Sequence, residues 1–107
     1  MKTKTKLWRI YIPANDNAGL EFSLEHHQKW DEYVRNLVGG VTIMKSAKGQ
    51  WVSPHGKLYI DKMIPCEINC FKSQIKQIAR FSIEHYDQEA IAYLPLSRGM
   101  KIMKKII

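Results

Sequence analysis

Two segments with helical periodicity, separated by short alternating stretches, most constrain what this chain can fold into. The first covers about residues 24–38, where Ser23 is suited to cap the start and Gly39–Gly40 to end the helix. Its apolar side chains recur at i, i+3, i+4 and i+7, namely Trp30, Tyr33, Val34 and Leu37. A second helix, with Ser73 as its expected cap, is predicted from the spacing of Ile75, Ile78, Ala79, Ser82 and Tyr86.

The remaining segments favour β-strands. Residues 7–12 alternate and are followed by Pro13, and 41–44, 50–52 and 58–70 are β-favouring stretches separated by expected turns at 47–49 and 53–56. Within 58–70, Pro65 indicates an edge position or a bulge. Residues 88–94 form the last expected strand, which should end at Pro95.

The order β, α, β-hairpin, α, β without a repeat predicts a single α+β domain over 1–107. We expect a ferredoxin-like split βαβ sandwich, with both helices on one face of an antiparallel sheet. The other face would carry Arg9, Tyr11 and alternate residues of the later strands. Because small domains rarely leave such a face bare, it is expected to bind a ligand or a second copy, and we predict a homo-oligomer.

The charge is concentrated at the two ends of the chain. The 17 Lys and Arg exceed the 10 Asp and Glu by 7, yet residues 10–97 hold 9 basic and 10 acidic groups. The basic terminal segments, at about 1–6 and 98–107 with Arg9 close by, would either keep the ends soluble or form an anion-attracting rim. The final segment RGMKIMKKII suits an edge strand or a helix docked on a partner, and its periodicity does not decide between them.

The sequence also bears on compartment and redox state. No apolar run reaches the roughly 18 residues of a membrane helix, and the N-terminus lacks a signal-peptide pattern. We therefore expect no membrane partner and a cytoplasmic location. If a phage encodes the chain, that location is the host cytoplasm. The two cysteines, Cys66 and Cys70, would share one face of a strand about 13 Å apart, too far for a disulfide or a shared metal. They are predicted to be reduced, small apolar side chains.

Motifs of known catalytic or cofactor sites are missing from the sequence. It contains no glycine-rich dinucleotide or phosphate loop, no His-Glu-x-x-His and no Gly-x-Ser-x-Gly, which disfavours catalysis and predicts no cofactor and no metal. The neighbours His26 and His27 lack the i, i+4 spacing of metal ligands, and we interpret them as helix surface.

The segment 51–59 carries the most informative side chains. Trp51, His55, Lys57 and Tyr59 place aromatic rings, an imidazole and an ammonium group around one tight turn, and such groups bind nucleotides. The alternative is that Trp51 fills the core while the turn is merely solvated. Further candidate ligand-binding residues are Arg80, Arg9 and Tyr11. Arg80 belongs to a basic stripe along the second predicted helix, and the alternative is that this stripe is an ordinary solvated helix face.

Four segments resemble a loose family of small proteins of uncharacterised activity found in bacteria and their phages. They are YIPANDNAG, the helix end GGVT, GQWVSPHGKLYID and HYDQEAIAY, and together they span about residues 10–94. The resemblance supports the fold and implies no particular activity.

Together these features predict a non-catalytic protein that captures a small anionic, nucleotide-like molecule, in the manner of a phage protein that sequesters a host defence signal. One alternative is a nucleic-acid-binding protein that uses the basic termini, although the strands lack an RNA-binding signature and we expect only weak binding. The other alternative is an interaction module that inhibits a host protein.

Overall fold

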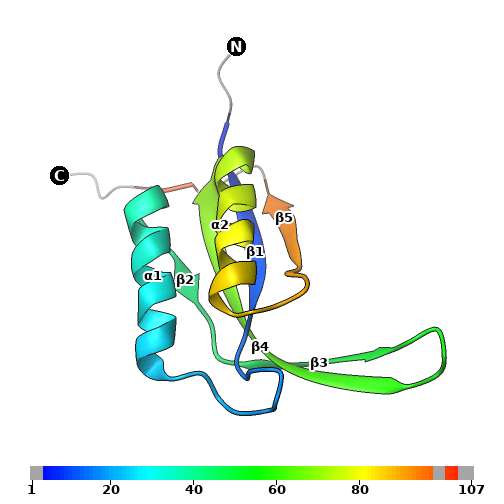
Figure 1. The fold of residues 1–107 in the computed structure, drawn as a ribbon. Coiled ribbons are helices and arrows are strands. Elements are labelled where there is room, and N and C mark those ends of the chain that lie inside the picture. Colours follow the sequence, from blue (N-terminus) through cyan, green and yellow to red (C-terminus); the bar gives the residue numbers. More distant parts are fainter. Residues whose placement is uncertain (1–3, 98–100, 104–107) are drawn as a thin grey trace.

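A computed structural model describes residues 4–97 and 101–103 of the chain. Two helices lie on one face of an antiparallel sheet, and a long hairpin projects away from these two layers (Figure 1). The elements are β1 (Lys6–Pro13), α1 (Leu24–Val38), β2 (Thr42–Ile43), β3 (Ala47–Val52), β4 (Leu58–Cys70), α2 (Lys72–His85) and β5 (Tyr93–Ser97). The predicted ferredoxin-like α+β fold is confirmed.

The strand order β2-β4-β1-β5 places β1 and β4 in the middle of the sheet, with β3 paired to the far end of β4. The β1–β4 register sets Ile10 opposite Cys66 and Trp8 opposite Ile68. Since side chains alternate between faces, these residues point toward the helices and form the core together with Trp30, Val34, Ile75, Ile78 and Tyr86. The face that carries Arg9 and Tyr11 points the other way, and we call it the outer face.

Both helices form where the apolar spacing predicted them. Ser23 caps α1 by accepting a hydrogen bond from the His26 backbone N–H at 3.1 Å, and Gly39 ends it with φ 91°. The cap predicted for α2 is wrong, because Phe71 is its N-cap residue and its backbone N–H is bound by the Gln74 side chain at 2.9 Å. Ser73 is an exposed residue of the first turn instead.

Three strand predictions need correction. Residues 47–49 are not a turn but the start of β3, paired with Met63, Lys62 and Asp61. Pro65 lies inside the central strand β4 opposite Tyr11, and its carbonyl accepts a hydrogen bond from the Met44 N–H at 2.9 Å. The last strand begins at Tyr93 and continues through Pro95, which β5 tolerates because it is an edge strand.

Both cysteines are buried on the helix side of β4, which confirms their prediction as small core residues. Burial raises the pKa of the Cys66 thiol to about 12 and that of the Cys70 thiol to about 11. Neither thiol is therefore ionised to any useful extent near neutral pH.

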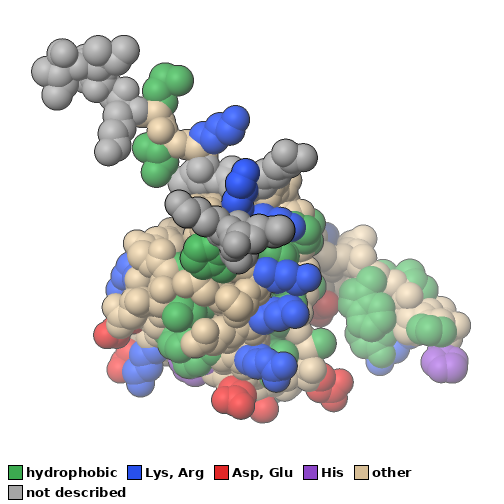
Figure 2. All heavy atoms as spheres, turned by 90° about the horizontal axis from the view of Figure 1, so that it is seen from above, with side chains coloured by type: hydrophobic (Ala, Val, Ile, Leu, Met, Phe, Trp, Pro, Cys, Tyr) green, Lys and Arg blue, Asp and Glu red, His purple; other side chains and the backbone are tan. Residues whose placement is uncertain are grey.

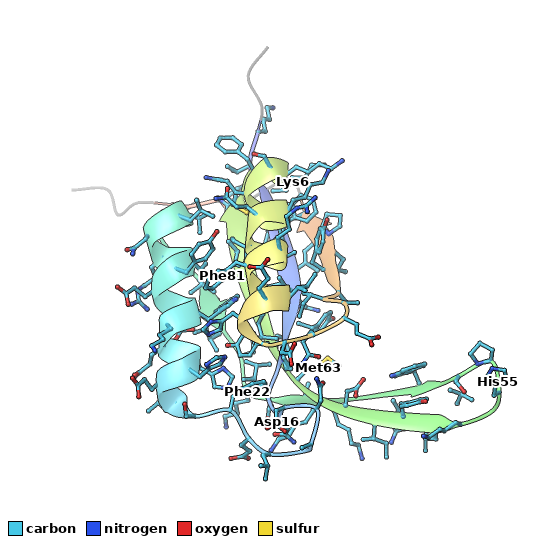
Figure 3. All side chains as sticks on the ribbon, viewed as in Figure 1. Lys6, Asp16, Phe22, His55, Met63 and Phe81 are labelled. Carbon is cyan, nitrogen blue, oxygen red and sulfur yellow. The ribbon has the colours of Figure 1, made fainter. Side chains whose placement is uncertain are left out.

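The two adjacent histidines of α1 are not plain helix surface, as the sequence indicated, but lie half-buried in the seam between the helices. The His26 and His85 rings stack at 3.8 Å, and the ring Nε2 of each lies within 2.7 Å of the other's backbone carbonyl. His27 hydrogen-bonds through Nδ1 to the Tyr86 hydroxyl at 2.7 Å. Phe22 and Phe81 continue the stack on either side and help tie the two helices together (Figure 3).

The hairpin of residues 47–62, which we call the arm, leaves the two-layered body beyond Met63. Its β3 and β4 segments pair with each other, the Lys62 carbonyl at its base accepts a hydrogen bond from the Ala14 N–H at 3.1 Å, and exposed hydrophobic side chains gather along the arm (Figure 2). The turn at its end is held by the Ser53 hydroxyl, which accepts hydrogen bonds from the backbone N–H groups of His55 and Lys57. Gly56 has φ 81°, a conformation that suits glycine.

No helix in the described part of the chain is long and apolar enough to cross a membrane. Of the predicted basic ends, Lys4, Lys6 and Lys101 lie within the described residues, whereas residues 1–3, 98–100 and 104–107 lie outside them. The predicted roles of those segments therefore remain predictions.

Candidate ligand site on the outer face

Alternation along the arm places its aromatic residues on the outer face. Trp51 pairs with Tyr59 across the two strands, and their rings stack with centroids 4.3 Å apart and planes 11° from parallel. The Trp51 ring is not in the core, since the residue is 50% exposed. Its Nε1–H donates to the Asp61 carboxylate at 3.1 Å, which fixes the ring along the strand.

A cation lies against this aromatic pair. The Lys57 ammonium group is 5.0 Å from the centroid of the Tyr59 ring, within the range of a cation–π interaction. His55 lies at the end of the arm, where it is exposed (Figure 3). Aromatic planes and a positive charge are thus adjacent on one side of the hairpin.

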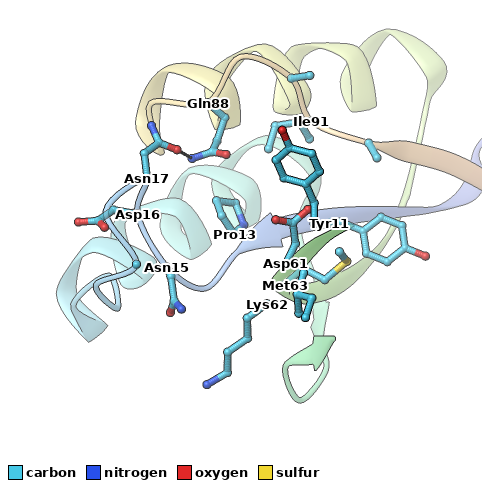
Figure 4. A pocket seen from close by; sticks show the side chains of 15 residues that line it. Tyr11, Pro13, Asn15, Asp16, Asn17, Asp61, Lys62, Met63, Gln88 and Ile91 are labelled. Carbon is cyan, nitrogen blue, oxygen red and sulfur yellow. Dashed lines mark hydrogen bonds between the residues drawn. The ribbon is translucent and has the colours of Figure 1, made fainter. Parts of the chain in front are cut away.

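A cavity of about 700 Å³ opens where the arm meets the body. One wall is formed by outer-face side chains of the sheet, and the opposite wall by the loop 15–19 and the segment 88–92 (Figure 4). The wall residues used below are Tyr11, Tyr59, Asp61, Asn15, Asn17 and Gln88. Because Tyr59 lines the cavity and also stacks on Trp51, the aromatic pair and the cavity form one continuous site.

The charged and amide residues that line the cavity are Asn15, Asn17, Gln88, Asp16, Asp61 and Lys62. Asn17 donates to the Asp87 carbonyl at 3.1 Å and accepts a longer contact of 3.5 Å from Gln88. The Asn15 side-chain oxygen is buried and has no hydrogen-bond partner among the described residues. A buried acceptor without a partner costs about 1–3 kcal/mol of folding free energy.

Gly49 shapes the arm side of the cavity. A Cβ at this position would lie 2.6 Å from the terminal methyl carbon of Met63, so only glycine leaves room for Met63 to lie across β3. Met63 marks the base of the arm in Figure 3 and lines the cavity in Figure 4. The glycine that looked like part of a turn in the sequence therefore serves a packing role.

The structure brings together four of the seven predicted site residues and separates the others. Trp51, Lys57 and Tyr59 are adjacent, and Tyr11 lies in the same cavity as Tyr59. Arg9 shares the outer face but is bound to the Glu67 carboxylate at 2.7 Å, and this hydrogen bond raises the pKa of its guanidinium.

Arg80 and His55 lie apart from the cavity. Arg80 is an exposed residue of α2, in the helix layer on the far side of the sheet, and His55 is confined to the turn of the arm. The amides of 15–17 and Gln88 were not predicted as site residues. The run Asn-Asp-Asn indicated only a turn, and no local signal places Gln88 beside it.

Comparison with known proteins supports the fold and gives no family. No protein-family model matches the chain, and no curated protein matches it in sequence. Among solved structures, a phage SAM lyase in complex with S-methyl-5'-thioadenosine is similar with a TM-score of 0.67 at 13% identity, over 94% of this chain and 86% of that one.

Two CutA proteins are similar to the same degree. CutA1 from Oryza sativa has a TM-score of 0.65 at 12% identity, over 95% of this chain and 84% of that one. The periplasmic divalent cation tolerance protein CutA from Archaeoglobus fulgidus has a TM-score of 0.60 at 16% identity, over 91% and 88%. At these identities the similarity establishes a shared fold.

Proposed function

We propose that this protein captures a small anionic, nucleotide-like molecule on its outer face, without chemical conversion. The observation that carries the proposal is the stacked Trp51–Tyr59 pair, exposed to solvent and continuous with a 700 Å³ cavity lined by amides and carboxylates. Cavities of 300–1,000 Å³ with a few placed polar groups are typical of small-molecule sites.

The chemistry of the site matches the parts of a nucleotide. Tyr59 and Tyr11 offer ring faces for a base, Asp61 offers an acceptor for ribose hydroxyls, and the amides of Asn17 and Gln88 can bind the edge of a base. Lys57 lies on the arm side of Tyr59, where it would bind a phosphate group. A phage protein of the same fold in complex with a nucleoside, S-methyl-5'-thioadenosine, is consistent with this ligand class.

A biological role follows from the ligand class and from the family resemblance. The chain would act in the cytoplasm of an infected host, where it would sequester a nucleotide signal of host defence. Such a role requires tight binding and no turnover, and the site offers stacking rings, amides, two carboxylates and the lysines Lys57 and Lys62 as binding groups.

The test is calorimetric titration with adenosine 5'-monophosphate and with adenosine, which differ by the phosphate alone. Tyr59→Leu removes the shared ring and should weaken both ligands about fivefold or more, because stacking contributes roughly 1–3 kcal/mol per base. Lys57→Ala should weaken the monophosphate about tenfold or more and leave adenosine unchanged, because a charged hydrogen bond contributes roughly 1.5–3 kcal/mol.

Lys76→Ala is the matched control, since Lys76 is an exposed lysine on α2, in the layer opposite the site. It should change neither affinity. Absence of binding at millimolar concentration of either ligand, or equal affinities in wild type and Tyr59→Leu, would contradict the proposal. Cyclic dinucleotides titrated in the same way would show whether the site prefers a signal molecule to a mononucleotide.

A further inference from the structure

The side of the arm opposite the Trp51–Tyr59 pair carries a group of exposed apolar side chains. Val52, Leu58 and Ile60 point to the helix side of the hairpin, and they are 63%, 54% and 57% exposed. An isolated two-stranded hairpin is marginally stable in water unless an apolar face packs against something. Nothing in the described residues covers this face.

The same chain has an apolar groove between α1 and β2. Its volume is about 280 Å³, its floor includes Ile64 and Cys66, and its rim carries Leu24 and Ile43, which are 73% and 49% exposed. The groove and the arm face are thus two exposed apolar surfaces on one molecule.

The charges beside the two apolar surfaces are opposite. Lys48 and Lys62 stand directly across from each other on the helix side of the arm, and such like-charged cross-strand pairs are destabilising. Lys62 makes a long contact of 3.6 Å to the exposed Glu21. In the groove, Asp31 is partly desolvated, which raises the pKa of its carboxyl, and a lysine beside it would stabilise the charged form.

The arm cannot fill its own groove. It projects from the end of the sheet away from α1, whereas the groove lies alongside α1 and β2 (Figure 1). The contact must therefore form between molecules.

We propose that the arm of one copy lays Val52, Leu58 and Ile60 into the α1–β2 groove of a second copy, with Lys48 beside Asp31. Each copy contributes one arm and one groove, so the contacts close either reciprocally in a two-fold dimer or head to tail around a ring. Ile60 also borders the ligand cavity, whereas Val52 and Leu58 do not, so variants of these two test the contact separately from the proposed ligand.

The first test is the mass of the protein and its variants in solution, measured by light scattering at tens of micromolar. The wild-type chain should have a multiple of the 12.5 kDa chain mass. Leu58→Asp in the arm, at a position that does not line the ligand cavity, and Ile43→Asp in the groove should each give a monomer. Leu20→Asp is the control, since Leu20 is 67% exposed but lies in neither surface, and it should keep the wild-type mass.

The second test mixes the two monomeric variants. The arm variant retains an intact groove and the groove variant an intact arm, so an equimolar mixture should form a species of twice the chain mass. Circular dichroism melts of each variant show that it is folded. A monomeric wild type, or variants that stay associated, would overturn the proposal.

A mixture that stays monomeric would also overturn it. Leu94→Asp on the outer face identifies the interface in that case, because Leu94 lies across from Arg9 and is 37% exposed. Loss of association in this variant, without recovery on mixing, would assign the contact between copies to the outer face instead of the arm.

Discussion

Ser82→Ala tests how the two helices are joined. The Trp30 indole N–H donates to the Ser82 hydroxyl at 2.8 Å, and that hydroxyl donates to the Ile78 carbonyl at 2.7 Å. Trp30 is 1% exposed and Ser82 is fully buried, so water cannot replace a lost partner. Removal of the hydroxyl leaves a buried N–H unsatisfied, which costs about 1–3 kcal/mol of unfolding free energy.

For a domain of this size that loss corresponds to a fall of about 5 to 15 °C in the melting temperature. Thermal and urea unfolding followed by circular dichroism would measure it. Ser73→Ala on the same helix is the control, since Ser73 is exposed and does not cap α2, and it should change the stability by less than about 0.5 kcal/mol.

A double-mutant cycle with Trp30→Phe separates two contributions to the loss of unfolding free energy, that of the Trp30–Ser82 hydrogen bond and that of removing the Ser82 hydroxyl itself. In the phenylalanine background there is no indole N–H to satisfy, so the additional Ser82→Ala change should cost little. An equal cost of Ser82→Ala in both backgrounds, or a cost below about 0.5 kcal/mol in the wild type, would refute the reasoning.

Three further outcomes follow from local geometry. Gly39→Ala should destabilise the protein by about 1 kcal/mol in urea unfolding because φ is 91° there, whereas Gly40→Ala, with open space and no such φ, should change little. Burial lowers the pKa of His27 below its ordinary value near 6.5, so the free energy of unfolding should fall as the pH falls from about 6.5 through the pKa of His27 in the folded protein. His27→Gln should flatten this pH dependence of stability, whereas His55→Gln should leave it in place. Burial raises the pKa of Cys66 to about 12, so iodoacetamide at neutral pH should modify this thiol in the folded protein far more slowly than in urea, as mass spectrometry would show.

The body of the fold could be predicted because its signals are local. Residues 24–38 carry a cap, an apolar period and a terminating glycine within one segment, and the structure has the helix at these residues. The adjacency of Trp51, Lys57 and Tyr59 is local too, since it follows from two strands joined by one short turn. Such features need no knowledge of the rest of the chain.

Features that depend on distant partners could not be predicted. Ala47 to Gly49 have weak strand preferences and resemble a turn, yet they extend β3 because the long strand β4 offers them backbone partners. The pairing of His26 with His85 joins residues 59 apart in sequence, and no spacing rule indicates it. Arg80 was grouped with the aromatic turn on residue type alone, whereas the sheet separates the two.

The alternation of side chains along the arm gives its two faces separate tasks. Trp51, Tyr59 and Asp61 point to the outer face, and Val52 and Leu58 point to the helix side, so neighbouring positions belong to different proposed contacts. Because every arm substitution proposed above replaces an exposed or half-exposed side chain on one face, it leaves the other face and the backbone pairing intact. Loss of ligand binding with association retained, or the reverse, would therefore assign the lost function to one face of the same hairpin.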